Sequence, residues 1–164
     1  MPIELYRIDD RLIHGQVVVG WGQPLDVQRI VLVDDEVAIS EWEQELYRMG
    51  VPPEMEIVFH HVAGAAAALA QLQRDPVRAI VLVGSVQTMA QLIEQTTATV
   101  PTVNIGGVHH ANGRTQRMRY VYLTDEEAAL LRSIAGRGVE VTAQDVPAGR
   151  AVPLDVVLSD GHDG

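Results

Sequence analysis

Short apolar runs rich in β-branched residues recur along this chain and alternate with stretches of helical pattern. This alternation constrains the fold more than any other feature. Seven runs predict strands, at residues 3–8, 29–34, 55–60, 78–84, 102–106, 119–123 and 139–144. Two of them contain the tetrapeptide Ile-Val-Leu-Val, at 30–33 and 80–83. Continuous apolar runs of this kind are typical of central strands that are covered on both faces of a parallel sheet.

Helical patterns fill the segments between these strands. Ser40 and Glu43 have the spacing of a capping box before a helix that stops at Gly50, and Thr124 and Glu127 repeat that spacing. Two further helices are predicted, an Ala- and Leu-rich one at 62–74 and an amphipathic one at 86–96. The alternation implies right-handed crossovers. It predicts an α/β fold, doubly wound, with a mainly parallel seven-stranded sheet and helices on both faces.

The length of the chain predicts one domain, residues 1–164. Residues 148–164 are expected to form a less ordered C-terminal tail. Within this tail, 152–158 is expected to pack as a last short element, and the final residues are expected to fray.

Composition and charge argue against several classes of function. The formal net charge is −10, which repels nucleic acid and anionic lipid, so neither is expected as a partner. There is no cysteine for a disulfide or a thiolate metal site, and no lysine for a Walker A phosphate loop. The first residues are charged too early for a signal peptide, and no apolar run approaches the roughly 18 residues of a membrane span. We therefore expect a cytoplasmic protein without direct membrane insertion.

The segment 7–21, RIDDRLIHGQVVVGW, places reactive side chains directly after the first predicted strand: Asp9, Asp10, Arg11 and His14. In open α/β sheets, ligand sites gather at the carboxyl ends of the strands. Gly15 and the apolar residues after it predict the start of a helix, where backbone N–H groups and the helix dipole favour an anion such as phosphate. A histidine there either donates to a bound phosphate or becomes phosphorylated itself. Trp21 is expected to pack the helix.

The neighbours of His14 suit the second of these roles. A neutral imidazole, whose pKa is ordinarily about 6.5, carries a lone pair that can attack phosphorus. Arg11 would stabilise the phosphoryl group together with backbone N–H groups of a short run, Ile13, Gly15 and Gln16. Asp9 or Asp10 would hold Arg11 or fix the imidazole tautomer. The alternative is a solvated polar loop with an ordinary surface histidine.

Other strand ends carry residues that would line the same pocket. Asp34 and Asp35 follow the second strand, although acids at a helix N-terminus are an equally good interpretation. Gly106 and Gly107 follow another strand and either let the backbone approach a phosphate or only form a tight turn. Three basic or titratable residues come next as pocket candidates: His109, His110 and Arg114.

No metal and no cofactor is expected. Four of the six histidines form adjacent pairs, at 60–61 and 109–110, and adjacent residues of a strand point to opposite faces. Neither pair has the i, i+4 spacing of a helical zinc motif, and no G-x-G-x-x-G follows a strand.

The segment 7–21 closely resembles the signature of the IIB component of the mannose/fructose/sorbose family of the bacterial phosphotransferase system. That signature is Arg-(Val/Ile)-Asp-Asp-Arg-Leu-Ile-His-Gly-Gln-Val, followed by a Trp. The similarity continues through 29–38, 103–114 and 123–147 and weakens only in the tail.

The resemblance implies a seven-stranded, mainly parallel sheet and a protein-N(π)-phosphohistidine–sugar phosphotransferase. Such a protein accepts a phosphoryl group from a phosphorylated IIA protein on His14, usually at Nδ1. It passes the group to a sugar bound by the IIC/IID membrane component, so it works in the cytoplasm and transiently at the inner face of the membrane. Arg11, Asp9 and Asp10 correspond to the charged residues of the family motif.

Two alternatives remain open. One is a regulatory phosphocarrier that delivers nothing to a sugar. The other is a hydrolase like the histidine phosphatases, although Ile13 stands where those enzymes need an arginine. The sequence does not indicate which sugar is carried, because selectivity is expected to reside in the membrane component.

Overall fold

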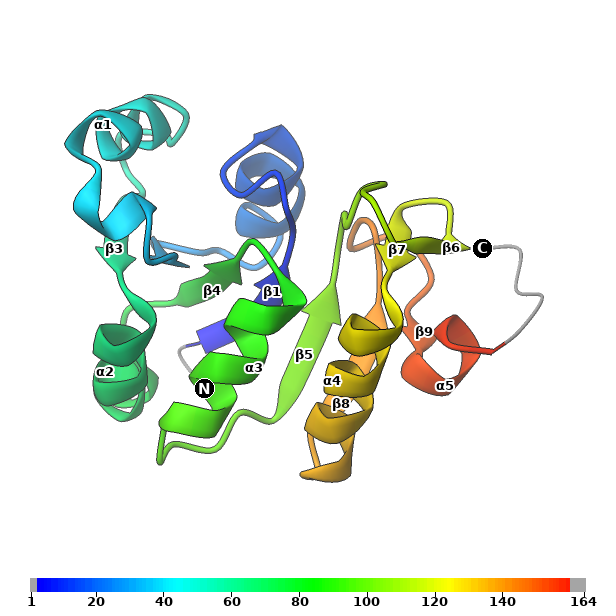
Figure 1. Ribbon diagram of the computed structural model, residues 1–164. Helices are drawn as coiled ribbons and strands as arrows, with labels where there is room; N and C mark the ends of the chain where they lie inside the picture. Colours follow the sequence, from blue (N-terminus) through cyan, green and yellow to red (C-terminus); the bar gives the residue numbers. More distant parts are fainter. Residues whose placement is uncertain (1–2, 160–164) are drawn as a thin grey trace.

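The main sheet has seven strands in the order β3-β2-β4-β1-β5-β8-β9, and all neighbouring pairs except β8–β9 are parallel. The computed structural model (Figure 1) describes residues 3–159. The strand bounds are β1 (Ile3–Ile8), β2 (Arg29–Val33), β3 (Glu56–His60), β4 (Ala79–Val83), β5 (Thr102–Ile105), β8 (Glu140–Ala143) and β9 (Val152–Pro153). The predicted mainly parallel, seven-stranded α/β fold is confirmed.

The membership of the sheet differs from the prediction at one strand. The run at 119–123 forms β7 (Val121–Leu123), which pairs with β6 (Thr115–Met118) in a separate antiparallel ribbon. Val121 and Leu123 are buried while Tyr122 is half-buried, so this strand covers the core with one face only. Such one-sided burial suits an antiparallel ribbon rather than a parallel strand enclosed on both faces. The seventh place in the main sheet goes to β9, from the predicted tail.

The repeated Ile-Val-Leu-Val tetrapeptide forms the centre of the sheet. Its two copies lie in β2 and β4, which are neighbours, and they pair in register from Ile30 opposite Ile80 to Val33 opposite Val83. Because side chains alternate across a strand, each copy serves two cores. The Ile and Leu side chains belong to the core formed with η1 (Gln16–Gly22), whereas the valines belong to the core formed with α2 (Val62–Arg74), α3 (Val86–Gln95) and α4 (Asp125–Gly136).

The helices begin and end close to the predicted positions. They are α1 (Glu41–Met49), α2 (Val62–Arg74), α3 (Val86–Gln95), α4 (Asp125–Gly136) and α5 (Leu154–Val157), with a 3₁₀ turn η2 (Val37–Ile39). Ser40 accepts a hydrogen bond from Glu43 N at 3.4 Å. Thr124 and Glu127 form the complete capping box, because Thr124 Oγ1 accepts from Glu127 N and Glu127 Oε1 accepts from Thr124 N, at 3.0 and 2.9 Å.

The C-terminal segment is built into the fold as far as the structure describes it. Val152, Leu154, Val157 and Leu158 are buried, which confirms the last short element predicted at 152–158. The fraying predicted for the end of the chain falls mainly on residues 160–164, which lie outside the described residues. Within residues 3–159, no helix is both long and apolar enough to cross a membrane.

Candidate functional site

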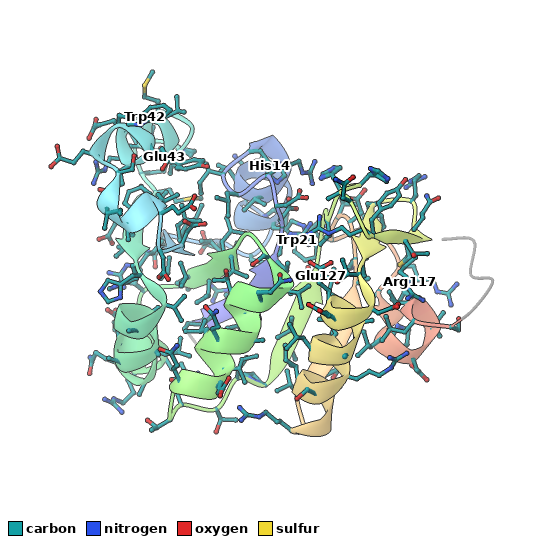
Figure 2. The ribbon with its side chains drawn as sticks, viewed as in Figure 1. His14, Trp21, Trp42, Glu43, Arg117 and Glu127 are labelled. Carbon is teal, nitrogen blue, oxygen red and sulfur yellow. The ribbon has the colours of Figure 1, made fainter. Side chains whose placement is uncertain are left out.

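The loop that carries His14 lies at the carboxyl edge of the sheet, where β1 meets β5. After β1 the chain turns to η1 on one face of the sheet, and after β5 it leads through the β6–β7 ribbon to α4 on the other face. The two connections diverge, which is the usual place for a ligand crevice in such folds. The loop is fixed there by two backbone bonds, from Asp9 N to Val83 O at 2.9 Å and from Asp10 N to Gly107 O at 2.8 Å. Figure 2 shows His14 at this end of the molecule.

The predicted helix start after His14 is confirmed. Gly15 has helical dihedral angles and precedes η1, a π-helix, and the amides of Val17 and Val18 both donate to His14 O at 3.1 and 3.0 Å. Ile13, Gly15 and Gln16 are therefore the chain neighbours of His14 at the start of η1. The side chain of Gln16 lies outside what the structure describes.

Asp9 is the centre of the site. Its side chain is 0% exposed and accepts hydrogen bonds from Arg11 Nε and Nη2 at 3.1 Å each, from Arg7 Nη2 at 3.2 Å and from Gly107 N at 3.2 Å. Burial alone would raise the pKa of this carboxyl group. The hydrogen bond from Arg11 and the charges of Arg7 and His14 outweigh burial and lower the pKa below its ordinary value, so Asp9 is ionised at neutral pH.

His14 points its Nε2 at this buried carboxylate, with 3.4 Å between Nε2 and Asp9 Oδ1. Burial lowers the pKa of His14 from its ordinary value; Asp9 raises it, and the positive charge of Arg11 lowers it further. The ring is consequently neutral near pH 7. If the neutral ring donates to this ionised carboxylate, which can only accept, its proton is on Nε2 and its lone pair is on Nδ1. The His14 side chain is 18% exposed.

Arg7 is the site residue to which sequence analysis assigned no role. Its guanidinium group is 0% exposed, and it donates to Asp9, to the side chain of Asn104 and to the carbonyl oxygens of Gln144 and Asp145. The sequence signals are its place as the first residue of the segment 7–21 and its position inside a mostly apolar strand, where a buried arginine has to be paired. Its partners come from β5 and from the end of β8, so only the tertiary structure identifies them.

Trp21 packs as predicted and also supports Arg7. It is 5% exposed, its ring lies 4.8 Å from Arg7 Cζ, and its indole Nε1 donates to Asp145 O at 3.2 Å. The indole therefore forms one wall of the pocket that holds the buried cation.

Asp10 faces away from Asp9 and binds His109. Asp10 Oδ2 accepts from His109 N at 2.7 Å, and Asp10 Oδ1 lies 2.6 Å from His109 Nδ1. Of the two aspartates left open by the sequence, Asp9 is the one that contacts both Arg11 and His14, and its role in orienting them stays a prediction.

Arg114 anchors the His109 loop. It donates to both carboxylate oxygens of Glu127 at 3.0 and 2.9 Å and to His109 O at 2.8 Å. His110 instead lies edge-on against Tyr122, with 5.7 Å between ring centroids.

The two glycines after β5 make room for charged side chains. A Cβ on Gly106 would overlap the guanidinium group of Arg7 and lie 2.7 Å from Asp9 Oδ2. A Cβ on Gly107 would lie 3.0 Å from His109 Cε1 and 3.2 Å from Arg11 Nη2. Both glycines have ordinary negative φ, so the need is for space rather than for an unusual turn.

Asp34 and Asp35 serve as backbone caps in the structure. Asp34 Oδ1 accepts from Glu36 N and Val37 N at 2.9 and 3.0 Å, and Asp35 Oδ1 accepts from Val62 N at 2.8 Å. This geometry favours the helix-capping interpretation, and their place in a phosphate pocket stays a prediction. Among residues 3–159 there is no group of three or more His, Asp or Glu side chains that could hold a metal ion.

The fold and the site together define an α/β protein with a half-buried histidine at the carboxyl edge of the sheet, beside a buried aspartate that is bound by two arginines. Residues 3–163 match the family model described as "PTS system sorbose subfamily IIB component", and the chain belongs to this family of sugar phosphotransferase components. The resemblance seen in the sequence is thereby confirmed.

Known relatives of the chain cover most of its length. It is 36% identical over 149 residues to the N-acetylgalactosamine-specific phosphotransferase enzyme IIB component 1 of Escherichia coli K12, covering 88% of this chain and 91% of the relative. It is 31% identical to the fructose-specific EIIB component of Bacillus subtilis, with 90% of each chain covered. The crystal structure of the IIBSor domain of the sorbose permease from Klebsiella pneumoniae superimposes with a TM-score of 0.86 at 30% identity and covers 96% of each chain.

Proposed function

We propose that this chain carries a phosphoryl group on His14 Nδ1, taking it from a phosphorylated IIA protein and passing it to a sugar bound by a IIC/IID membrane component. The observation that carries the proposal is the 3.4 Å approach of His14 Nε2 to the buried carboxylate of Asp9. This contact supports a neutral ring with its lone pair on Nδ1, which is the form required of a nucleophile.

The proposed transfer is an in-line displacement at phosphorus. His14 Nδ1 forms a P–N bond as the P–N bond to the donor histidine breaks, and the leaving nitrogen keeps the electron pair of the broken bond. In the second step the oxygen of a sugar hydroxyl attacks the same phosphorus and the P–Nδ1 bond breaks, with its electron pair returning to Nδ1. The hydroxyl proton leaves to solvent or to a base of the membrane component. His14 then returns to its starting form.

Arg11 is proposed to stabilise the charge on the phosphoryl oxygens. It is 36% exposed and therefore reachable from solvent, while Asp9 holds its Nε and Nη2. Asp9 also offsets much of its positive charge. A carrier needs this balance, because a site that bound the phosphoryl group too tightly could not pass it on.

The proposed partners and place of action follow from the same chemistry. IIA and IIC/IID must each reach His14 in turn, so we propose a cytoplasmic protein that docks transiently at the inner face of the membrane. The relatives are named for fructose, N-acetylgalactosamine and sorbose, so their names do not agree on one sugar. We propose that the membrane component selects the sugar.

The test is to map the phosphoryl group. The chain is incubated with a phosphorylated IIA protein, and separately with phosphoramidate as a small donor, and the product is examined by mass spectrometry and ³¹P NMR. An acid-labile, base-stable phosphate on His14 is expected, and His14→Ala should carry none. His110→Ala, which alters a different histidine, is the matched control and should be labelled like the parent chain. Undiminished labelling of His14→Ala would refute the assignment.

A second measurement separates sugar delivery from a purely regulatory carrier. Phosphorylated chain is mixed with membranes that contain IIC/IID, with and without sugar. Sugar-dependent loss of the phosphoryl group supports transport. A phosphoryl group that persists whatever sugar is added contradicts delivery and favours the regulatory alternative.

A further inference from the structure

A second imidazole, that of His109, lies beside Arg11 at Gly107. The point where a Cβ on Gly107 would sit lies 3.0 Å from His109 Cε1 and 3.2 Å from Arg11 Nη2, so the two side chains are close neighbours on one side of that glycine. The His109 side chain is 55% exposed and Arg11 is 36% exposed. Two groups that can carry positive charge therefore border the same accessible space.

The position of His109 is fixed from two directions. Its amide and its Nδ1 are both bound to the Asp10 carboxylate, at 2.7 and 2.6 Å. Its carbonyl oxygen accepts from Arg114, which is held by both oxygens of the buried Glu127. Because Glu127 belongs to the capping box of α4, the loop is tied to a regular element of the fold. Figure 2 shows Glu127 at the top of this helix, below the loops at the His14 end of the molecule.

This anchoring determines which edge of the ring is available. Because Asp10 holds Nδ1, the second nitrogen, Nε2, is directed away from Asp10, and Cε1 next to it lies beside Gly107 and Arg11. An anion that binds Arg11 would be within reach of a donor on this edge. The phosphoryl group proposed for His14 is such an anion.

We propose that His109 is a second catalytic residue, whose Nε2–H donates a hydrogen bond to an oxygen of the phosphoryl group on His14, with Asp10 as its positioning residue. This inference rests on the proposed function. With a carboxylate on one nitrogen and a phosphoryl oxygen on the other, both nitrogens of His109 carry a proton. No bond to phosphorus is made or broken by His109; it shares with Arg11 the charge of the transferred group.

Two substitutions separate this contact from a merely structural role. His109→Asn retains a donor near the Nδ1 position, which can still bind Asp10, but removes the donor at the Nε2 position. His109→Gln does the reverse. If His109 contacts the phosphoryl group, the Asn variant should be phosphorylated by phosphoramidate about tenfold or more slowly, the effect of one charge-assisted hydrogen bond, and the Gln variant should recover part of the rate.

The order of the two variants decides the question. A structural role through Asp10 predicts the opposite order, with Gln slow and Asn normal. His61→Asn is the matched control, because His61 caps the start of α2 and Asn can cap it too, and this variant should keep the parent rate. The proposal requires that Asn be at least tenfold slow and that Gln be faster than Asn; any other order refutes it. Thermal unfolding of each variant establishes that it is folded.

A direct reading comes from the ¹⁵N NMR signals of the imidazole rings. On phosphorylation of His14, the Nε2 signal of His109 should move to the range of a protonated, hydrogen-bonded nitrogen, while the ring signals of His110 stay in place. An unmoved His109 signal in a chain that is phosphorylated on His14 overturns this inference and leaves the proposed function standing. A parent chain that takes up no phosphoryl group overturns the proposed function instead.

Discussion

Gly106→Ala tests whether the buried charge network controls the site. The added methyl group would overlap the guanidinium group of Arg7 and lie 2.7 Å from Asp9 Oδ2, and both of these side chains are 0% exposed. Neither can move without losing partners, because Arg7 is bound to Asp9, Asn104 and two carbonyl oxygens. The methyl group must therefore break hydrogen bonds that involve charged groups.

The cost can be estimated from the bonds that would be lost. One or two hydrogen bonds to a charged group contribute about 1.5–3 kcal/mol each, and overpacking a core typically costs about 1–3 kcal/mol. We expect the free energy of unfolding to fall by at least about 3 kcal/mol, near the lower end of the sum of these terms. For a chain of this length, that corresponds to a fall in Tm of roughly 6–12 °C. Phosphorylation of His14 should slow as well, because Asp9 would no longer hold the ring and Arg11 in place.

Urea unfolding and the rate of labelling by phosphoramidate measure the two effects. The matched control is Gly136→Ala, at the end of α4, where an added Cβ meets nothing within 4 Å. A glycine-to-alanine change in a helix should raise stability by up to about 1 kcal/mol and leave labelling unchanged. If Gly106→Ala stays within about 0.5 kcal/mol of the parent chain and is labelled at the parent rate, the reasoning about the buried network is wrong.

Two further predictions concern Arg11 and His14. Arg11→Ala should slow phosphorylation by about 10–100-fold while lowering the free energy of unfolding by only about 1 kcal/mol, because the side chain is 36% exposed; an unchanged labelling rate would remove its proposed role. Because burial lowers the pKa of His14, an NMR titration of its ring should give a midpoint below the ordinary value of about 6.5, and a midpoint at or above that value would contradict this. Because the pKa of His14 is lower in the folded chain, the unfolded chain binds a proton at His14 more readily. The contribution of His14 to the free energy of unfolding is therefore fully present above about pH 6.5 and is lost as the pH falls toward the pKa of the folded state. His14→Gln should therefore flatten the loss of stability between about pH 7 and 5, as measured by urea unfolding, and an unchanged slope would argue against a neutral ring in the folded protein.

The sequence by itself determined the elements and the location of the site. Six of the seven strands of the main sheet follow from continuous apolar runs, and the helix starts at Ser40 and Thr124 follow from capping residues, because both signals are local along the chain. His14 could be placed for the same reason: a polar segment that follows an apolar strand in an α/β fold has to lie at the carboxyl edge of the sheet.

Only the tertiary structure determined which charged side chains pair with which partners. Arg7 meets Asn104, which is 97 residues away along the chain, and Asp10 meets His109, which is 99 residues away. No local pattern encodes such pairs, since they exist only once β1 and β5 lie side by side. The same reason explains why the run at 119–123 forms β7 outside the main sheet, while β9 takes the seventh place in it. A strand's neighbours depend on packing across the whole molecule and not only on its own residues.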